Sequence, residues 1–218
     1  MPIKHLAISL DDISDWCRKN NTSIEKSCNK YFEIVSRLLE LQVKSKIPIF
    51  TIYLLHENVE KSDSYISFCD CLANFFNELP NNAVISMQKI KISIFGKWYN
   101  LPGKAVESLK NIIESTKEYD NFFVNFCINY DGQEEIVDAC KLVAKQVELG
   151  KIDSEMITKE TLKENMYASY FLQPDVILIY GERKLTGLLL WDSVGSRIVF
   201  AGKSFMEFEE EDIEKFIE

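Results

Sequence analysis

Three aspartates follow the first apolar segment of the sequence closely enough to share a metal ion. Asp11, Asp12 and Asp15 lie within five consecutive positions. Clustered carboxylates can bind Mg²⁺ through oxygen ligands and waters, and the metal could then hold a diphosphate. The alternative is that Asp12 and Asp15 cap or solvate the first turn of a helix, where acidic residues are common. From spacing alone we expect the capping role.

Two later loops carry further groups that could act on a substrate. Glu57 and Asn58 follow the second apolar segment beside His56. A glutamate and a histidine could act as acid and base, but a solvated loop is the alternative. A turn bounded by glycines brings Lys184 and Thr186 together. The ammonium and the hydroxyl could bind phosphate, although a solvated turn explains these residues nearly as well.

An apolar stripe runs along the segment that follows the second loop. Phe68, Leu72 and Phe75 recur at three- and four-residue steps. A stripe with this spacing most often packs a helix into the core. It could instead line a hydrophobic tunnel for a lipid tail, and the periodicity does not separate the two roles.

The elements that position these residues follow from the apolar pattern. Near-continuous apolar runs predict buried parallel strands, at Ile3–Ser9, Ile47–Leu55, Lys89–Phe95, Phe122–Ile128, Val176–Tyr180 and Arg197–Ala201. One helix is predicted to follow a capping box at Thr22–Glu25. Further helices are predicted across Ser64–Glu78, Gly103–Thr116, Gln133–Glu148 (with Asp131 as its cap), Lys159–Ser169 and Glu209–Ile217. The alternation predicts one α/β domain over residues 1–218, with a central, mainly parallel sheet of about six strands flanked by helices. The loops described above then meet at the carboxyl ends of the strands.

The composition excludes several classes of protein. The chain has 218 residues and a net charge of −9, with 25 Lys and Arg against 34 Asp and Glu. This balance argues against nucleic-acid binding and against a polybasic membrane anchor. No apolar run reaches the ~18 residues of a membrane span, and no secretion signal opens the chain. The cysteines lack the spacing of a disulfide framework, and Cys69 and Cys71 are interpreted as reduced thiols rather than half of a zinc site. We expect a cytoplasmic protein with at most peripheral membrane contact.

In their order and spacing, the loops together resemble the cis-prenyltransferases, the undecaprenyl and dehydrodolichyl diphosphate synthase family. The resemblance covers nearly the whole chain. It is carried by the stretch from His5 to Asp11 with Trp16, by Thr51–Tyr53 with Glu57-Asn58, by Asn129-Tyr130-Asp131-Gly132, and by Pro174-Asp175, Gly181-Glu182, Lys184-Leu185-Thr186 and Leu189-Leu190-Trp191.

The resemblance implies an activity and a set of site residues. The family adds isopentenyl diphosphate units to an allylic starter with Mg²⁺, beside a hydrophobic tunnel. It therefore implies Asp11 as the metal residue, Glu57 and Asn58 as further catalytic residues, and Lys184 and Thr186 as a diphosphate grip. The resemblance also implies that Phe68, Leu72 and Phe75 line the wall of this tunnel.

The sequence departs from the family where the chemistry needs charge. Asp12-Ile13-Ser14-Asp15 stands in place of the family's Gly-Asn-Gly-Arg, and Arg197 in place of an acidic residue that helps to hold Mg²⁺. If Arg197 points toward Asp11, the two could form an ion pair where the metal would lie. These departures and the shortened stretch at Pro174–Gly181 resemble the non-catalytic, Nogo-B-receptor-like subunit of heteromeric enzymes. Accessory chains of this kind can donate a C-terminal Arg-x-Gly tail to the partner's active site, and the residues 214–218 do not have this sequence. We therefore expect a scaffolding role rather than donation of a tail.

The expected function is an accessory, catalytically silent subunit of a heteromeric cis-prenyltransferase that makes polyprenyl diphosphate. Its partner would be a catalytic subunit, in a heterodimer or heterotetramer, and Mg²⁺ would not bind to this chain alone. The alternatives are an active homomeric enzyme with an altered diphosphate site and a homodimer that binds an isoprenoid lipid.

Overall fold

A six-stranded parallel sheet forms the centre of the computed structural model, which describes residues 2–56 and 63–216. Its order is β3-β4-β2-β1-β5-β6, and every pairing is parallel. The strands are β1 (His5–Ser9), β2 (Ile49–His56), β3 (Ile90–Phe95), β4 (Phe122–Tyr130), β5 (Val176–Ile179) and β6 (Arg197–Phe200). The predicted fold class is confirmed. The most continuously buried strands, β1, β2 and β5, lie inside the sheet, whereas β6 is an edge strand and is mostly exposed.

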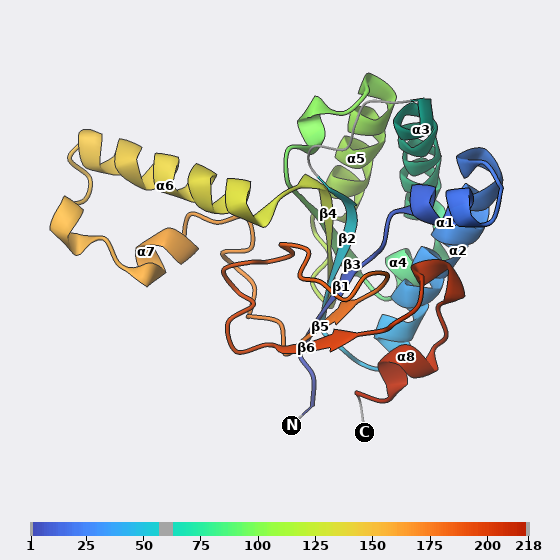
Figure 1. The fold of residues 1–218 in the computed structure, drawn as a ribbon. Helices are drawn as coiled ribbons and strands as arrows, with labels where there is room; N and C mark the ends of the chain where they lie inside the picture. Colours follow the sequence, from blue (N-terminus) through green and yellow to red (C-terminus); the bar gives the residue numbers. More distant parts are fainter. Residues whose placement is uncertain (1, 57–62, 217–218) are drawn as a thin grey trace.

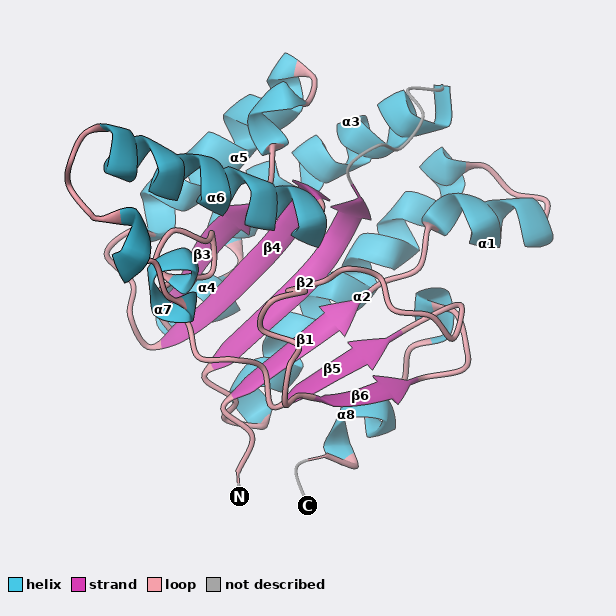
Figure 2. Ribbon diagram, turned by 60° about the vertical axis from the view of Figure 1, so that its left-hand side comes forward, coloured by secondary structure: helices cyan, strands magenta, loops and turns pink. Residues whose placement is uncertain are grey.

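One face of this sheet is covered by helices, and two other helices project beyond the sheet (Figures 1 and 2). The covering helices are α1 (Ile13–Lys19), α2 (Ile24–Lys44), α3 (Asp63–Glu78), α4 (Ala83–Met87) and α5 (Gly103–Thr116). Their apolar faces and the sheet bury one large cluster that includes Val35, Leu38 and Phe76. The helices α6 (Gly132–Glu148) and α7 (Lys159–Lys163) form an arm that projects from the body (Figure 1).

The second face of the sheet is covered mainly by irregular chain. A smaller apolar cluster joins Tyr53, Cys127 and Ile177 in the strands to Leu188 and Leu189 in the connection between β5 and β6. The short helix α8 (Glu211–Glu214) lies near the C-terminus of the chain. None of the described helices combines the length and the apolar character needed to cross a membrane.

Three local predictions were wrong. The helix predicted over Lys159–Ser169 ends at Lys163, because the backbone amides of Tyr167 and Ala168 donate to the carboxylate of Glu135 instead of to helix carbonyls. The capping box at Thr22–Glu25 does not form: α2 has Ser23 as its N-cap without a side-chain cap bond. The hydroxyl of Ser67 on α3 donates instead to the carboxylate of Glu25.

The third error concerns the cysteines. Cys71 is joined in a disulfide to Cys28, which ties α3 to α2 across 43 positions of sequence. Cys69 remains a free, buried thiol, as expected. Spacing along the chain did not indicate the disulfide, because helix packing rather than sequence proximity brings the two sulfur atoms together.

Candidate functional site

The carboxyl ends of β1, β2 and β5 open into one cleft of about 420 Å³. Parallel pairing of these strands brings together loops that lie far apart in the sequence. The cleft contains Asp11, Lys184 and Thr186, three of the residues that the sequence indicated, and its lining is Leu10, Asp11, Asp12, Asp15, His56, Tyr180, Glu182, Lys184, Leu185 and Thr186.

Asp11 is bonded to a segment near the C-terminus. Its Oδ1 accepts the backbone N–H of Phe205 at 2.7 Å, across 194 positions of sequence. Gly181 lies directly against Asp11, since a Cβ at that position would come within 2.6 Å of the Asp11 Cβ. Gly181 also has a φ of +78°, a conformation that favours glycine. The turn after β5 and the segment around Phe205 therefore both close on Asp11.

The other two aspartates of the first loop have local partners. Asp12 is the N-cap of α1, and its Oδ1 accepts the backbone N–H of Ser14 at 2.8 Å. This confirms the capping role. Asp15 pairs with Arg18 one turn further along the helix, with 2.7 Å between Oδ1 and Nη2. Each of the three aspartates therefore has one carboxylate oxygen bonded to another group of the protein: Asp11 to Phe205, Asp12 to Ser14 and Asp15 to Arg18.

Lys184 and Thr186 line the cleft in different ways. The Nζ of Lys184 lies 2.6 Å from Oε2 of Glu182, and both side chains are mostly exposed. The bond to Glu182 raises the pKa of Lys184 above its ordinary value. The hydroxyl of Ser9, at the end of β1, donates a hydrogen bond to Oγ1 of Thr186, with 2.8 Å between the oxygen atoms. The loop is thereby attached to the sheet through Thr186, whereas Lys184 extends into solvent.

His56 ends β2 at the margin of the cleft. Burial lowers its pKa below the ordinary value, against the opposing effect of the nearby carboxylates of Asp12 and Asp131. Its ring lies 4.1 Å from that of Tyr53, measured between centroids. The predicted partners Glu57 and Asn58 lie outside the described residues.

The apolar stripe on α3 packs mainly against aromatic rings of α2. Phe75 stacks on Phe32 with 4.7 Å between centroids, and Phe68 lies 5.9 Å from the same ring. Leu72 is fully buried. Beside the cleft, Phe68 lines a cavity of about 50 Å³ with Tyr31 and other residues. Leu72 and Phe75 do not line this cavity, and Phe75 instead lines a separate hollow of about 500 Å³ together with Phe32.

Arg197 does not meet Asp11. It begins β6, where it is paired in register with Val176, whereas Asp11 follows the end of β1. The two residues are therefore at opposite ends of the parallel sheet. The guanidinium of Arg197 lies 5.4 Å from the ring centroid of Phe216 instead.

The described side chains around Asp11 do not form an all-protein cage for a magnesium ion. Within residues 2–56 and 63–216, no group of three or more His, Cys, Asp or Glu side chains is placed to share a metal. The Asp11 oxygen that faces Phe205 is already an acceptor, and Asp12 and Asp15 are bonded locally. Magnesium in proteins is usually held by one or two carboxylates together with waters and substrate phosphates, rather than by side chains alone.

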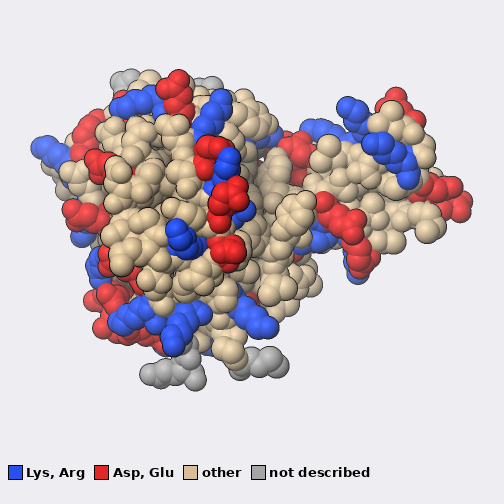
Figure 3. Space-filling model, turned by 180° about the vertical axis from the view of Figure 1, so that it is seen from behind, with Lys and Arg blue, Asp and Glu red and all other residues tan. Residues whose placement is uncertain are grey.

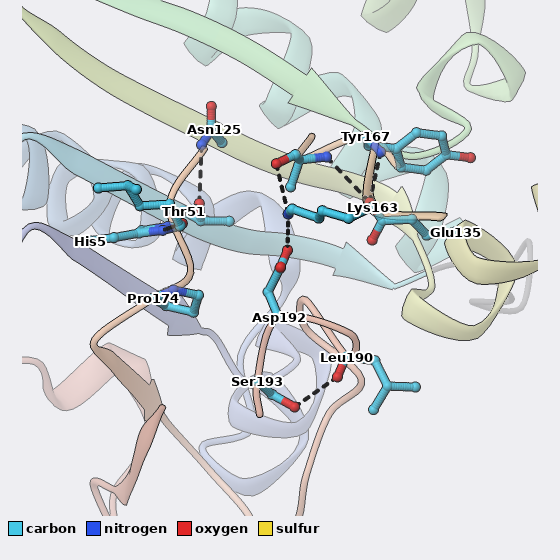
Figure 4. Close-up of polar contacts among 12 residues, drawn as sticks. His5, Thr51, Asn125, Glu135, Lys163, Tyr167, Pro174, Leu190, Asp192 and Ser193 are labelled. Atoms are coloured by element: carbon cyan, nitrogen blue, oxygen red, sulfur yellow. Dashed lines mark hydrogen bonds and ion pairs between the residues drawn. The ribbon is translucent and has the colours of Figure 1, made fainter. Parts of the chain in front are cut away.

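A buried polar cluster on the second face of the sheet was not predicted (Figure 4). Glu135 on α6 accepts the hydroxyl of Tyr130 at 2.5 Å and the amide of Tyr167 at 2.8 Å. Lys163 pairs with the buried Asp192, at 2.5 Å between Nζ and Oδ2. The cluster fastens the chain after α7 and the chain before β6 to the body. Its members come from distant segments, so sequence alone carried no signal for it.

His5 belongs to a second polar group on the same face (Figure 4). Its Nδ1 lies 2.6 Å from the carbonyl oxygen of Leu172, and its Nε2 lies 2.8 Å from Oγ1 of Thr51. The amide nitrogen of Asn125 donates to the same hydroxyl oxygen at 3.2 Å. Burial lowers the pKa of His5 from 6.5 to about 4, which favours the neutral imidazole.

Comparison with known proteins gives a consistent set of relatives. The family model described as "Putative undecaprenyl diphosphate synthase" matches residues 11–218. A tritrans,polycis-undecaprenyl-diphosphate synthase (geranylgeranyl-diphosphate specific) from Thermoplasma volcanium is 30% identical, over 94% of this chain and 81% of its own length. An isoprenyl transferase from Thermotoga maritima is 26% identical, over 99% of this chain and 92% of its own length.

Solved structures share the fold. Lavandulyl diphosphate synthase from Lavandula x intermedia, in complex with dimethylallyl diphosphate, superposes with a TM-score of 0.91. Its identity is 20%, and the match covers 98% of this chain and 93% of that one. A probable undecaprenyl diphosphate synthase from Campylobacter jejuni gives a TM-score of 0.78 at 21% identity, covering 100% of this chain and 94% of that one.

Proposed function

This chain belongs to the undecaprenyl diphosphate synthase family of cis-prenyltransferases, and from that premise we propose that it is a catalytically silent accessory subunit. Its partner is a catalytic chain of the same family, of the kind that the Nogo-B-receptor-like subunits accompany, in a heterodimer or heterotetramer. The complex makes polyprenyl diphosphate, and this chain contributes surface and stability rather than chemistry.

The charge of the cleft is the observation that carries the proposal. Its described lining contains four carboxylates, from Asp11, Asp12, Asp15 and Glu182, and one lysine, Lys184. That lysine lies against Glu182. A diphosphate carries several negative charges, and each charge-assisted contact that such a ligand lacks forfeits ~1.5–3 kcal/mol. Several missing contacts remove useful affinity, since every ~1.4 kcal/mol is a tenfold change in Kd.

Two hollows of different size adjoin the stripe on α3. Ligand pockets usually enclose about 300–1,000 Å³, whereas the cavity beside Phe68 has about 50 Å³. That is room for a water molecule or two, not for an isoprenoid chain. A second hollow of about 500 Å³ is lined by Phe32 and Phe75, so the lipid-binding homodimer is left for the test of polyprenol binding by the chain alone.

The projecting arm of α6 and α7 supports the partner role. Val137 and Leu142 on α6 are 43% and 50% exposed, and Leu149 and Met156 between the helices are 59% and 70% exposed. Apolar side chains this exposed on a projecting element offer surface for contact with another protein. The face opposite to that of Figure 1 carries acidic and basic side chains interspersed (Figure 3), as is usual for a solvated surface.

The experiment is reconstitution with a catalytic homologue from the same organism. The purified chain alone should incorporate no labelled isopentenyl diphosphate into a lipid product, and the mixture should form a stable complex with higher activity than the homologue alone. Robust turnover by this chain alone would overturn the proposal.

A pair of variants tests the arm as the contact surface. Leu142→Glu should weaken the complex, because it places a charge at an apolar position of α6 that is 50% exposed. Met87→Glu is the matched control, since Met87 is 76% exposed on α4, away from the arm. Equal effects of the two substitutions would exclude the arm.

An active homomeric prenyltransferase is the second candidate. The relative from Thermoplasma volcanium is named as a synthase, and Asp11, Lys184 and Thr186 do share one cleft. This candidate predicts turnover by the chain alone that Asp11→Ala and Lys184→Ala each reduce strongly. The absence of any turnover to reduce would dispose of it.

A further inference from the structure

Residues 203–214, which we call the C-terminal strap, are held against the body by interior contacts. The ring of Phe205 is fully buried between two tyrosines, with 5.3 Å from its centroid to that of Tyr31 and 5.4 Å to that of Tyr180. Tyr31 belongs to α2, and Tyr180 directly follows β5. The strap therefore closes the space between the covering helices and the end of the sheet.

Asp212 provides a second attachment inside the strap. Its Oδ2 accepts the hydroxyl of Tyr180 at 2.9 Å and the backbone N–H of Glu209 at 3.2 Å. The Nζ of Lys203 lies 2.9 Å from the same oxygen. Asp212 is only 8% exposed, so these bonds are made largely out of water and define the path of the strap.

The third attachment is the bond from the Phe205 amide to Asp11. It joins the backbone of the strap to the loop after β1, with 2.7 Å between the nitrogen and Oδ1. This is a charge-assisted hydrogen bond, and such bonds are stronger than neutral ones. Phe205 and Met206 are both buried, so the bond holds the strap on the side of Asp11 away from solvent.

We propose that Asp11 is a positioning residue that anchors the C-terminal strap, and that it does not bind a divalent metal in this chain. One carboxylate oxygen faces the strap, Gly181 closes on the side chain, and the neighbouring aspartates are bonded elsewhere. The inference rests on the silent role proposed for the cleft. Its test needs neither a partner nor a prenyl substrate, so the two proposals can fail separately.

Hydrogen exchange of the strap is the first measurement, on the full chain. Asp11→Ala should raise the exchange rate of the Phe205 amide and its neighbours by about tenfold or more, because the acceptor is lost. Asp11→Asn should stay within about threefold of the original rate, since an amide oxygen still accepts an N–H. Asp15→Ala is the matched control: it removes a carboxylate of the same loop that pairs with the exposed Arg18.

The second measurement separates the anchor from a metal ligand. Mn²⁺, used as a probe for the Mg²⁺ class of ion, should show no saturable binding to the original chain when free Mn²⁺ is measured by electron paramagnetic resonance. One-to-one binding that disappears in Asp11→Asn would overturn the proposal, as would unchanged exchange of the strap in Asp11→Ala. If Asp11→Ala does not fold, a normally folded Asp11→Asn supports the anchor, and a failure of both variants contradicts it.

Discussion

Two lysine–carboxylate pairs in this chain have the same chemistry and different surroundings. Lys184 and Glu182 lie in the cleft at the carboxyl ends of the strands, and their side chains are 71% and 72% exposed. Lys163 and Asp192 lie on the second face of the sheet, with side chains 23% and 5% exposed. The first pair is screened by water, and the second is largely withdrawn from it.

The difference indicates which of the two pairs contributes to the stability of the fold. Exposed ion pairs add little to stability, so the cleft can change its charges without unfolding the chain. The pair of Lys163 and Asp192 joins the end of α7 to the segment between β5 and β6. Removing one partner would leave the other as a buried charge without compensation. The exposed pair in the cleft and the buried pair on the second face should therefore respond differently to substitution.

Asp192→Ala should have the largest effect of the variants that test this comparison. It leaves the ammonium of Lys163 in a mostly buried position without its counter-charge, which typically costs about 3–5 kcal/mol. Urea denaturation gives the change in the free energy of unfolding.

The control for that variant is the double substitution Lys163→Met with Asp192→Leu. An apolar pair of similar volume should recover a large part of the lost stability, because no charge is stranded. A loss below ~1 kcal/mol for Asp192→Ala would contradict the structural role of the pair.

Acid should weaken the second face before the pH reaches that needed to protonate ordinary carboxylates. The pKa of His5 falls from 6.5 to about 4 on folding, so the unfolded chain binds the proton first as the pH drops. The stabilisation is present above pH 6.5 and is lost as the pH falls toward 4, by about 3 kcal/mol in total. Glu135 acts in the opposite direction, because burial raises its pKa.

A comparison with His5→Gln isolates the contribution of His5. Both chains are unfolded in urea at several pH values between 7 and 4. The original chain should lose more stability over this range than the variant, and parallel curves would show that His5 does not titrate as its burial requires.

Lys184→Ala should have the smallest effect. The ammonium is exposed and its partner Glu182 is equally solvated, so the denaturation midpoint should not change measurably. The activity of the complex with the catalytic partner should also be unchanged. A strong loss of activity would place Lys184 in working machinery and favour the homomeric enzyme.

The sheet could be predicted from the sequence because its signal is local. Near-continuous apolar runs at Ile3–Ser9 and Phe122–Ile128 predict strands, and the structure has strands at His5–Ser9 and Phe122–Tyr130. The order of strands and helices predicts the parallel class. The same argument placed Asp11, Lys184 and Thr186 at one edge, where they do line a common cleft.

The contacts that fix the roles of these residues could not be predicted. The bond from Phe205 to Asp11 spans 194 positions, and the disulfide of Cys28 and Cys71 depends on how two helices pack. Glu135 ends a helix by accepting amides from another segment, so the helical pattern beyond Lys163 was overridden by a tertiary contact. Periodicity along the chain contains none of this information.

Calorimetric titration of isopentenyl diphosphate into the isolated chain, with Mg²⁺ present, tests the central claim most directly. A cleft with four carboxylates and a lysine bonded to one of them should give no measurable heat of binding up to millimolar ligand. Saturable binding with a micromolar Kd, lost in Asp11→Asn, would show that the diphosphate site is intact and would contradict the silent role.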